Sequence, residues 1–507
     1  MKYILGVDIG TTAIKAAVFD SNGQECGSRT EEYTLITPSA GMVELAAESY
    51  VETFSAAIKS AIESSGVNID DIVSLGMSAQ GETLLCLNQN GSPLRRAIVW
   101  MDNRAVDEAA FIERKLGRDI VHKTTGQVGM DAIWPASKML WLQRNEPDIY
   151  NKTAKFVMVK DYLIYLLTGR LICEDSLLCS TMWWDINTRE YWPEMLDLLE
   201  IKEEQLPEIV RQGEMVGTIS QDAAERFGLS KELMISAGAL DQACGALGVG
   251  NVNPGVFSES TGSALTSVTI VDKPILDPAM EMPCFASAIP GKYMLHAFST
   301  GGMAIRWYRD VFCAIEKEVA ELSGINAYTL IDREVEQVPP GSEGLIVLPH
   351  LQGSGPPDTN NLAKGVFYGV TLAHKKQHFS RGIMEGVTMV LRRMIEATEA
   401  LGIDIKEIIS LGGGSKSSVW CQIKSDATGL TIKIMKDTES AACLGAAILA
   451  GVGAGVWESP EEAATSITRE DKIYQPNEKN KEVYDQVFDN YKKLQEGTRE
   501  FFKVSLV

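Results

Sequence analysis

The chain has 507 residues, a formal net charge of −21 at pH 7 and a hydrophobic content of 45%. This length exceeds what one hydrophobic core supports and predicts two domains, residues 1–250 and residues 251–507. The acidic excess argues against nonspecific nucleic-acid binding, because polyphosphate backbones are repelled over most of the surface. The nine cysteines lack the spacing of a zinc site or a disulfide framework, which favours reduced thiols and a cytoplasmic location.

The sequence gives no sign of a secretion signal or a membrane span. The first residues enter an apolar strand directly. The longest uncharged stretch, residues 441–457, is short for a span and is interrupted by four glycines. It predicts a tightly packed interior helix followed by a loop, and we expect no membrane partner.

A polar hairpin begins the chain. Residues 3–7 and 16–19 have the apolar pattern of two paired strands. A glycine at the tip allows close approach of the backbone to a ligand, and turn N–H groups, two hydroxyls and a lysine suit phosphate oxygens. The aspartate could hold a divalent cation. An ordinary glycine turn explains the same pattern, so both interpretations stay open for Asp8, Gly10, Thr11, Thr12 and Lys15.

The following segments predict a mixed sheet flanked by helices. A third strand is expected at residues 25–33, and a helix runs through Val51 and Ile62 to Gly66. A further strand is predicted at residues 72–78. Antiparallel strands followed by alternating helix and strand are typical of this kind of α/β sheet.

The second half repeats the hairpin and adds a glycine-rich turn. Residues 255–268 form a second apolar hairpin with a hydroxyl and glycine tip. An amphipathic helix is predicted at residues 380–397 and another at residues 483–495. The strand at residues 408–411 runs into residues 412–417, where glycines before a helix expose N–H groups and partial positive charge to a ligand. A turn required only for packing is the alternative.

Two further places carry candidate chemistry. Asp241 ends an apolar segment, and a carboxylate there could take the proton of a substrate hydroxyl as its oxygen attacks a γ-phosphorus. A helix N-cap explains the same residue. Between residues 78 and 104, hydrogen-bonding side chains surround an indole, as in sugar pockets, although solvated loops beside a core tryptophan would look alike.

Taken in order, these segments resemble the FGGY family of carbohydrate kinases, which share the fold of actin, hexokinase and the chaperone ATPases. The resemblance implies two actin-like (ribonuclease H-like) α/β domains, each a mixed sheet flanked by helices, with an interdomain cleft. The N-terminal domain is expected to bind sugar and the C-terminal domain nucleotide. ATP and Mg²⁺ are the expected cofactors and a small sugar or polyol the expected substrate, while a homodimer stays open.

The resemblance also assigns residues to roles. Asp241 would be the general base, and the metal ligands would be Asp8 and Asp241. The residues expected to contact the sugar are Gln80, Glu82, Trp100, Asp102, Asp241 and Gln242. The residues expected to bind the nucleotide are Gly10, Thr11, Thr12, Lys15, Thr261, Gly262, Gly302, Arg306, Gly413, Gly414 and Ser417.

Length and layout are most similar to the xylulokinase branch, which favours a ketopentose such as xylulose. That branch typically has Gly-Gln-Met-His-Gly where this chain has residues 79–83, Ala-Gln-Gly-Glu-Thr. Glu82 is reminiscent of glycerol kinases, although Gly81 replaces their arginine. The alternatives are a kinase for glycerol, a tetritol, an aldonate or a quorum-sensing signal, or, in a different class, a nucleotide-gated interaction protein of the actin or chaperone type. Dinucleotide binding is disfavoured, because no GxGxxG motif begins a helix.

Overall fold

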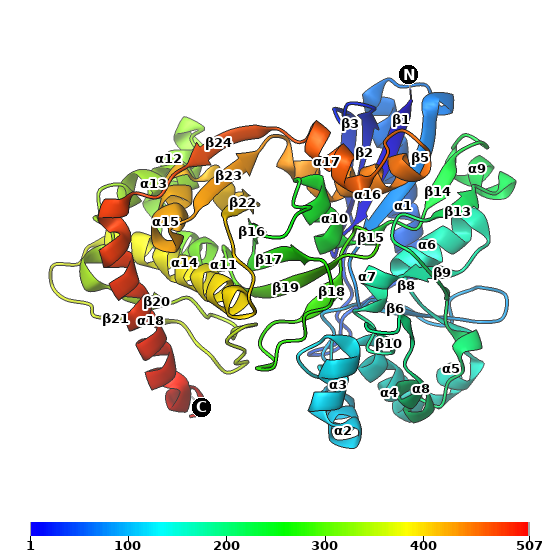
Figure 1. The fold of residues 1–507 in the computed structure, drawn as a ribbon, viewed down its shortest axis with the longest axis horizontal. Coiled ribbons are helices and arrows are strands. Elements are labelled where there is room, and N and C mark those ends of the chain that lie inside the picture. The colour runs from blue at the N-terminus through cyan, green and yellow to red at the C-terminus, as the bar shows by residue number, and fades with distance from the viewer. Residues whose placement is uncertain (1, 505–507) are drawn as a thin grey trace. The chain divides into compact units, whose positions relative to one another are not determined.

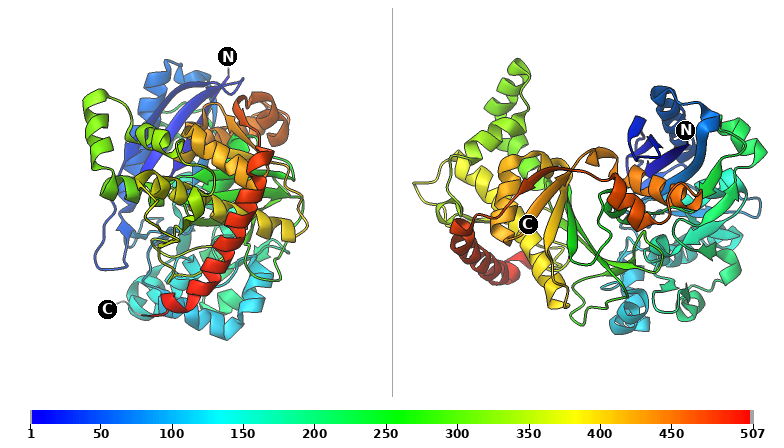
Figure 2. Two further views of the ribbon diagram at one scale, coloured as in Figure 1. Left: turned by 90° about the vertical axis from the view of Figure 1, so that its left-hand side faces the viewer. Right: turned by 45° about the horizontal axis from the view of Figure 1, so that its top comes forward.

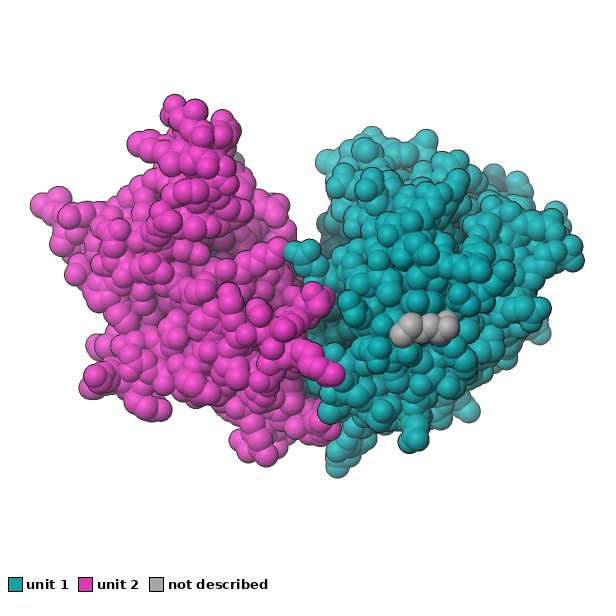
Figure 3. All heavy atoms as spheres, turned by 90° about the horizontal axis from the view of Figure 1, so that it is seen from above, with its two compact units in different colours: residues 1–252, 270–294, 439–468 teal, residues 253–269, 295–438, 469–507 magenta. Residues whose placement is uncertain are grey.

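The computed structural model describes residues 2–504, which form two compact units (Figures 1 and 3). Unit 1 comprises the chain up to Val252 together with Ile270–Met294 and Glu439–Thr468. Unit 2 comprises Asn253–Thr269, Leu295–Thr438 and the chain from Arg469 onward. Each unit is therefore assembled from separate stretches of sequence.

Unit 1 is built on a mixed sheet with the strand order β13-β14-β5-β1-β2-β3, and β15 pairs with the end of β5. The first two strands form the predicted antiparallel hairpin, whereas β5 runs parallel to β1. The bounds of these strands are β1 (Tyr3–Ile9), β2 (Ala13–Asp20), β3 (Glu25–Glu32), β5 (Ile72–Ala79), β13 (Met215–Thr218), β14 (Met234–Ser236) and β15 (Ala239–Leu240).

Glycines allow helices to lie directly on this sheet. Helix α16 (Ala441–Gly453) crosses β1 and β5, while α1 (Ala47–Ser65) contacts β2 and β3 (Figure 1). A Cβ added to Gly6 would lie 2.0 Å from the Cys443 carbonyl oxygen, and one on Gly445 would lie 2.0 Å from the Cys244 carbonyl oxygen in α10 (Asp241–Gly248). Any larger side chain would separate these backbones, so the glycines set the close packing of α10, α16 and the sheet.

A smaller sheet in unit 1, ordered β4-β7-β6-β8, frames the loops between residues 80 and 104. Its strands are β4 (Glu44–Leu45), β6 (Leu84–Leu87), β7 (Ala97–Ile98) and β8 (Lys155–Met158). The short remaining strands are β9 (Ile172–Glu174), β10 (Trp184–Asp185), β11 (Glu190–Tyr191), β12 (Glu208–Val210) and β18 (Cys284–Ala286). The remaining helices are α2 (Val106–Leu116), α3 (Arg118–Thr125), α4 (Pro135–Asn145), α5 (Pro147–Lys152), α6 (Val159–Thr168), α7 (Asp175–Leu178), α8 (Pro193–Leu198), α9 (Gln221–Phe227) and α17 (Pro460–Ile467).

Unit 2 contains a second mixed sheet, in which β16 pairs antiparallel with β17 and parallel with β22. The long helix α14 and the C-terminal helix α18 belong to this unit (Figure 2). Its strands are β16 (Val256–Thr261), β17 (Ala264–Val271), β19 (Tyr293–Thr300), β20 (Ile346–Leu348), β21 (Val366–Tyr368), β22 (Glu407–Leu411), β23 (Thr431–Met435) and β24 (Glu470–Tyr474). Its helices are α11 (Met303–Phe312), α12 (Ala314–Ser323), α13 (Ala327–Val335), α14 (Lys376–Ala400), α15 (Ser418–Thr428) and α18 (Lys481–Phe502).

The predicted elements are confirmed, with ends that differ by a few residues. Helix α1 begins before the first predicted apolar position and ends where Gly66 adopts a left-handed conformation. Helices α14 and α18 extend beyond their predicted apolar faces at both ends. The uncharged stretch after residue 441 is the interior helix α16. Among the described residues, no helix has the length and apolarity that a membrane span requires.

Candidate active site

The candidate residues of unit 1 meet where three neighbouring parallel strands end. Ile9 of β1 and Leu240 of β15 both pair with Ala79 of β5. The next residues along the chain are Gly10, Gln80 and Asp241. Ligands commonly bind at the carboxyl ends of parallel strands, and this register brings the hairpin tip, the amide and the carboxylate to the same edge.

Two acidic side chains lie within electrostatic reach of each other at this edge. Burial, together with the charge of the nearby Asp8 carboxylate, raises the pKa of Asp241 to about 7. Hydrogen bonds from Gln242 oppose this shift. Burial also raises the pKa of Asp8, against the hydrogen bond from the Ser78 hydroxyl at 2.7 Å. A carboxyl group with a pKa near the working pH is suited to proton transfer. Asp241 is the first residue of α10 and accepts the Gln242 N–H at 2.6 Å, whereas the N-cap is Leu240.

The tip of the first hairpin presents hydroxyls of different availability. The Gly10 N–H donates to the Ala13 carbonyl at 3.0 Å and closes the turn. The Thr11 hydroxyl accepts the Trp100 indole N–H at 2.8 Å, so its own proton stays free to donate, and Thr12 is exposed. The Lys15 ammonium donates to the Glu439 carbonyl at 3.0 Å, a contact that fixes its position while leaving two protons for a ligand.

The side chains of Gln80 and Glu82 each have a group that could hydrogen-bond a polar ligand. The Gln80 amide nitrogen donates to the Gly10 carbonyl at 3.1 Å, and its amide oxygen is buried without a hydrogen-bond partner among residues 2–504. Glu82 has a left-handed backbone with φ of 58°. Burial raises the pKa of Glu82, the Lys138 ammonium opposes this shift, and the Asp241 charge adds to it. A raised pKa favours the protonated carboxyl, which can donate a hydrogen bond.

Lys138 holds these loops together, a role that the sequence did not reveal. It lies on α4, is 0% exposed, and donates to the carbonyls of Glu82, Val99 and Trp100 at 2.9, 3.1 and 3.2 Å. Burial lowers its pKa to about 7. The available signal was a lysine in an apolar helical segment, which usually indicates a partner for the charge.

Asp102 is placed differently from the other predicted sugar contacts. Its two carboxylate oxygens accept four hydrogen bonds, one from the Val43 N–H and three from Arg104, at 2.5 to 2.9 Å. A carboxylate offers about four acceptor positions, so none is left for a substrate hydroxyl. The structure thus gives Asp102 an anchoring contact in place of a free acceptor.

In unit 2 the second hairpin and the glycine turn meet in the same way. Ser260 of β16 pairs with Leu411 of β22, so Thr261, the last residue of β16, and Gly412, the first residue after β22, lie at the same end of two neighbouring parallel strands. Gly262 accepts the Gly302 N–H at 2.8 Å, and a Cβ on Gly302 would lie 2.4 Å from the Gly262 carbonyl oxygen. A Cβ on Gly414 would lie 2.6 Å from that of Thr261. Glycine is therefore required sterically where the backbone turns approach one another.

The remaining candidates surround this turn. Ser417 caps α15, accepting the Trp420 N–H at 3.1 Å, and it donates to the Asp332 carboxylate at 2.9 Å. Burial raises the pKa of Asp332 to about 6. Gly413 begins a short 3-10 turn, and Arg306 lies exposed in the first turn of α11. These positions bring all the predicted nucleotide residues of unit 2 to the ends of β16 and β22 and the start of α11.

The donor set in unit 1 fits magnesium better than a metal with a full protein cage. Within residues 2–504 there is no group of three or more His, Cys, Asp or Glu side chains that could hold a metal ion. Mg²⁺ commonly binds through one or two carboxylates, several waters and substrate phosphates. Asp8 and Asp241 are two partly buried carboxylates within electrostatic reach of each other, and they match that requirement.

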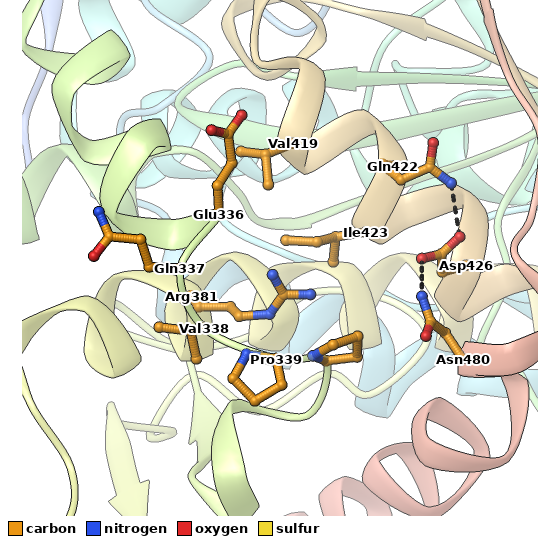
Figure 4. Close-up of a pocket in the computed structure, with 11 residues that line it drawn as sticks. Glu336, Gln337, Val338, Pro339, Arg381, Val419, Gln422, Ile423, Asp426 and Asn480 are labelled. Carbon is orange, nitrogen blue, oxygen red and sulfur yellow. Dashed lines mark hydrogen bonds between the residues drawn. The ribbon is translucent and has the colours of Figure 1, made fainter.

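Unit 2 contains a cavity of about 440 Å³ whose lining includes none of the predicted site residues. Figure 4 shows the residues that line it. The cavity is lined by α14, α15 and the segment after α13. Several of its polar side chains are paired with one another or with neighbours: Asp426 accepts from Gln422 and from Asn480, each at 2.7 Å, and Arg381 donates to Glu385 at 2.8 Å.

Known proteins match the whole length of the chain. Residues 3–248 match the N-terminal domain, and residues 264–454 the C-terminal domain, of the FGGY family of carbohydrate kinases. The xylulose kinase of Bacillus subtilis (strain 168) is 30% identical over 501 residues, 99% of this chain and 98% of that protein. The autoinducer-2 kinase of Salmonella choleraesuis (strain SC-B67) is 28% identical over 508 residues, 98% of this chain and 94% of that protein.

The fold is similar to solved structures as well. The gluconate kinase from Lactobacillus acidophilus is 26% identical, with a TM-score of 0.91 and 98% of each chain covered. The two family matches span most of the chain and include the first hairpin and the glycine turn, whereas β16 and the tip of the second hairpin lie between the two matches. The chain therefore belongs to the FGGY family of carbohydrate kinases, and it is a phosphotransferase.

Proposed function

We propose that this kinase transfers the γ-phosphoryl group of ATP to a hydroxyl of a small sugar or polyol, with Asp241 as the general base. The observation that carries this proposal is the Asp241 carboxyl, whose pKa of about 7 lets it accept a proton near neutral pH. The proton moves from the substrate hydroxyl to an Asp241 oxygen as the substrate oxygen bonds to phosphorus and the bond to ADP breaks. Gln242, hydrogen-bonded to the carboxylate, orients it.

The sugar would bind in unit 1 beside Gln80, Glu82 and Trp100. The unpartnered Gln80 amide oxygen can accept a hydroxyl proton, and the protonated Glu82 carboxyl can donate to a hydroxyl or carbonyl oxygen. The Trp100 ring offers an apolar face to C–H groups, while its N–H is committed to Thr11. Since Asp102 has no acceptor position left, we assign it to the support of this loop.

Each unit carries groups that suit a part of the nucleotide. In unit 1 these are the Thr11 and Thr12 hydroxyls and Lys15, which suit phosphate oxygens. In unit 2 the first turn of α11 with Arg306 and the turn at Gly413, Gly414 and Ser417 suit the nucleoside end. A magnesium ion held by Asp8 and Asp241 would neutralise phosphate charge.

A ketopentose such as xylulose is the substrate we favour. The xylulose kinase of Bacillus subtilis matches nearly the whole chain. The alternatives are an aldonate, glycerol, a tetritol or a quorum-sensing signal, because gluconate and autoinducer-2 kinases are similar as well. A protonated Glu82 can donate to a ketone, a hydroxyl or a carboxylate, so this residue alone admits each of them.

A substrate panel tests the proposal. Ketopentoses, gluconate, glycerol, tetritols and an autoinducer-2 precursor are assayed with MgATP for acceptor-dependent ADP release. We expect the largest kcat/KM for a ketopentose and a loss of turnover of about 10²–10⁴ in Asp241→Asn. Absence of acceptor-dependent turnover with every compound, combined with ATP-driven polymerisation or peptide-stimulated hydrolysis, would favour the nucleotide-gated interaction protein instead.

We also propose a cytoplasmic homodimer. Helix α12 has no buried residue within the described chain, and Ile315, Val319 and Leu322 on one face are 71%, 40% and 83% exposed. A helix of this length is marginal without packing. If α12 packs antiparallel against α12 of a second copy, with the two Val319 side chains at the centre, the apolar face is covered. Lys317 of each copy then lies opposite Glu321 of the other. Light scattering should show a dimer that Leu322→Glu converts to a monomer, and a wild-type monomer at micromolar concentration would contradict the pairing.

A further inference from the structure

Four buried side chains form one hydrogen-bonded cluster beneath the tip of the second hairpin. Glu259 and Ser410 are register partners on β16 and β22, and Lys424 of α15 contacts both of them. Figure 1 shows the positions of these three elements. Glu259, Thr261, Ser410 and Lys424 are each at most 1% exposed. The Lys424 ammonium donates to the Glu259 carboxylate at 2.6 Å, to the Thr261 hydroxyl at 2.8 Å and to the Ser410 hydroxyl at 3.3 Å.

The cluster fixes what the Thr261 hydroxyl can do. Its single proton goes to the second Glu259 oxygen at 2.7 Å, while one lone pair accepts from Lys424. What remains is acceptor capacity, and a phosphate oxygen is itself an acceptor. The hydroxyl therefore has no proton to give a nucleotide, in contrast to Thr11, whose hydroxyl only accepts within the protein.

The position of Thr261 nevertheless decides the shape of the glycine turn. A Cβ on Gly412 would lie 2.9 Å from the Thr261 carbonyl oxygen, and a Cβ on Gly414 2.6 Å from the Thr261 Cβ. Thr261 is thus in direct contact with both glycines. A shift of this residue would move the hairpin tip and the turn together, and displacements of about 1 Å in a binding site cost up to 10²-fold in rate.

We propose that Lys424 and Glu259 are positioning residues for the nucleotide, acting through Thr261, and that the Thr261 hydroxyl anchors the hairpin tip without donating to phosphate. This rests on the proposed function of the glycine turn as the nucleotide site. The ion pair is wholly buried, so loss of one partner alone would leave an uncompensated charge. Replacement of both by neutral residues of similar size removes the anchor while avoiding that penalty.

The test measures the Kd of a nonhydrolysable analogue of MgATP by calorimetry and the KM for the sugar by steady-state kinetics in three variants. In Lys424→Met/Glu259→Gln we expect the Kd of the analogue to rise on the order of tenfold to a hundredfold, with the KM for the sugar within about twofold. Thr261→Val should give a similar rise in this Kd, whereas Thr261→Ser, which keeps the hydroxyl, should bind the analogue with wild-type affinity. The matched control is Arg381→Met/Glu385→Gln, a buried pair of the same unit at 2.8 Å, which should leave the Kd unchanged at a comparable loss of thermal stability.

The triple variant separates an anchor from a direct phosphate contact. If Thr261 acts only through the pair, adding Thr261→Val to the double variant causes no further loss of affinity, because the two changes remove the same interaction. An additional independent loss, or wild-type affinity in a folded double variant, overturns the inference. A wild-type protein that does not bind the analogue would instead refute the proposed nucleotide site itself.

Discussion

Replacement of the proposed base, Asp241, should stabilise the protein while it lowers turnover. The pKa of Asp241 rises from an ordinary value of 3.8 to about 7, a difference of roughly three units. Each unit corresponds to about 1.4 kcal/mol of unfavourable free energy for the charged form. The native state therefore binds a proton more tightly than the unfolded chain, and folding loses stability as the pH rises from about 4 to 7.

The expected magnitude follows from the same shift. At pH 8 the full penalty is roughly 4 kcal/mol, and partial exposure of the carboxylate reduces it to about 2 kcal/mol. Asp241→Asn removes this penalty and keeps the side-chain oxygen that accepts the Gln242 N–H. At roughly 1 °C per kcal/mol for a chain of 507 residues, we expect the Tm of the variant to be about 2 °C higher at pH 8. The gain should fall below half at pH 5, where the wild-type carboxyl is protonated when folded.

The assay is thermal unfolding from pH 5 to 8 with EDTA, which keeps divalent cations from the two carboxylates. Asp102→Asn is the matched control with the opposite sign, because its carboxylate is fully hydrogen-bonded and pairs with the buried Arg104. It should destabilise the protein by about 3 kcal/mol or more. An equal or lower Tm for Asp241→Asn at pH 8, or a gain that does not depend on pH, would refute a raised pKa at this position.

Three further changes test separate parts of the structure. In the wild type we expect the KM for the sugar to rise above pH 8, as Glu82 loses its proton. Glu82→Gln keeps a hydrogen-bond donor at every pH, so this rise should disappear. The same dependence of KM on pH in both proteins would contradict a protonated Glu82. Lys138→Met removes three hydrogen bonds to backbone carbonyls and should lower stability by about 3 kcal/mol. It should also raise the KM for the sugar more than the KM for ATP. Equal rises in the two KM values would argue that Lys138 does not position the loops proposed to bind the sugar. Gly445→Ala places a Cβ 2.0 Å from the Cys244 carbonyl oxygen and should lower stability by about 3 kcal/mol in denaturant unfolding. The control is Gly497→Ala, which meets no neighbouring atom within 4 Å in α18 and should instead raise stability by about 0.5–1 kcal/mol; a similar gain in Gly445→Ala would contradict the close packing.

Local patterns predicted much of the fold. The two hairpins, the long helix α14 and the interior helix α16 follow from the period of their apolar residues and from glycine positions, because these features depend on short stretches of chain. The division into units does not follow from such patterns. Segments 270–294 and 439–468 join unit 1 through contacts distant in sequence.

The candidate site, like the fold, was predictable from the sequence only in part. The residue types at Asp8, Gln80 and Asp241 are visible in the sequence, but their meeting depends on β15, a strand of two residues whose pairing to β5 sets the common edge. Such a strand has no periodicity to detect.

The sequence by itself determined which groups were present: the carboxylates, the hydroxyls and the glycine turns. The tertiary structure alone decided their chemical state. It filled every acceptor position of Asp102, committed the Thr261 proton to Glu259 and shifted the pKa of Asp241 toward neutrality. Hydrogen-bond capacity and pKa depend on burial and on neighbours supplied by other segments, which the order of residues does not specify.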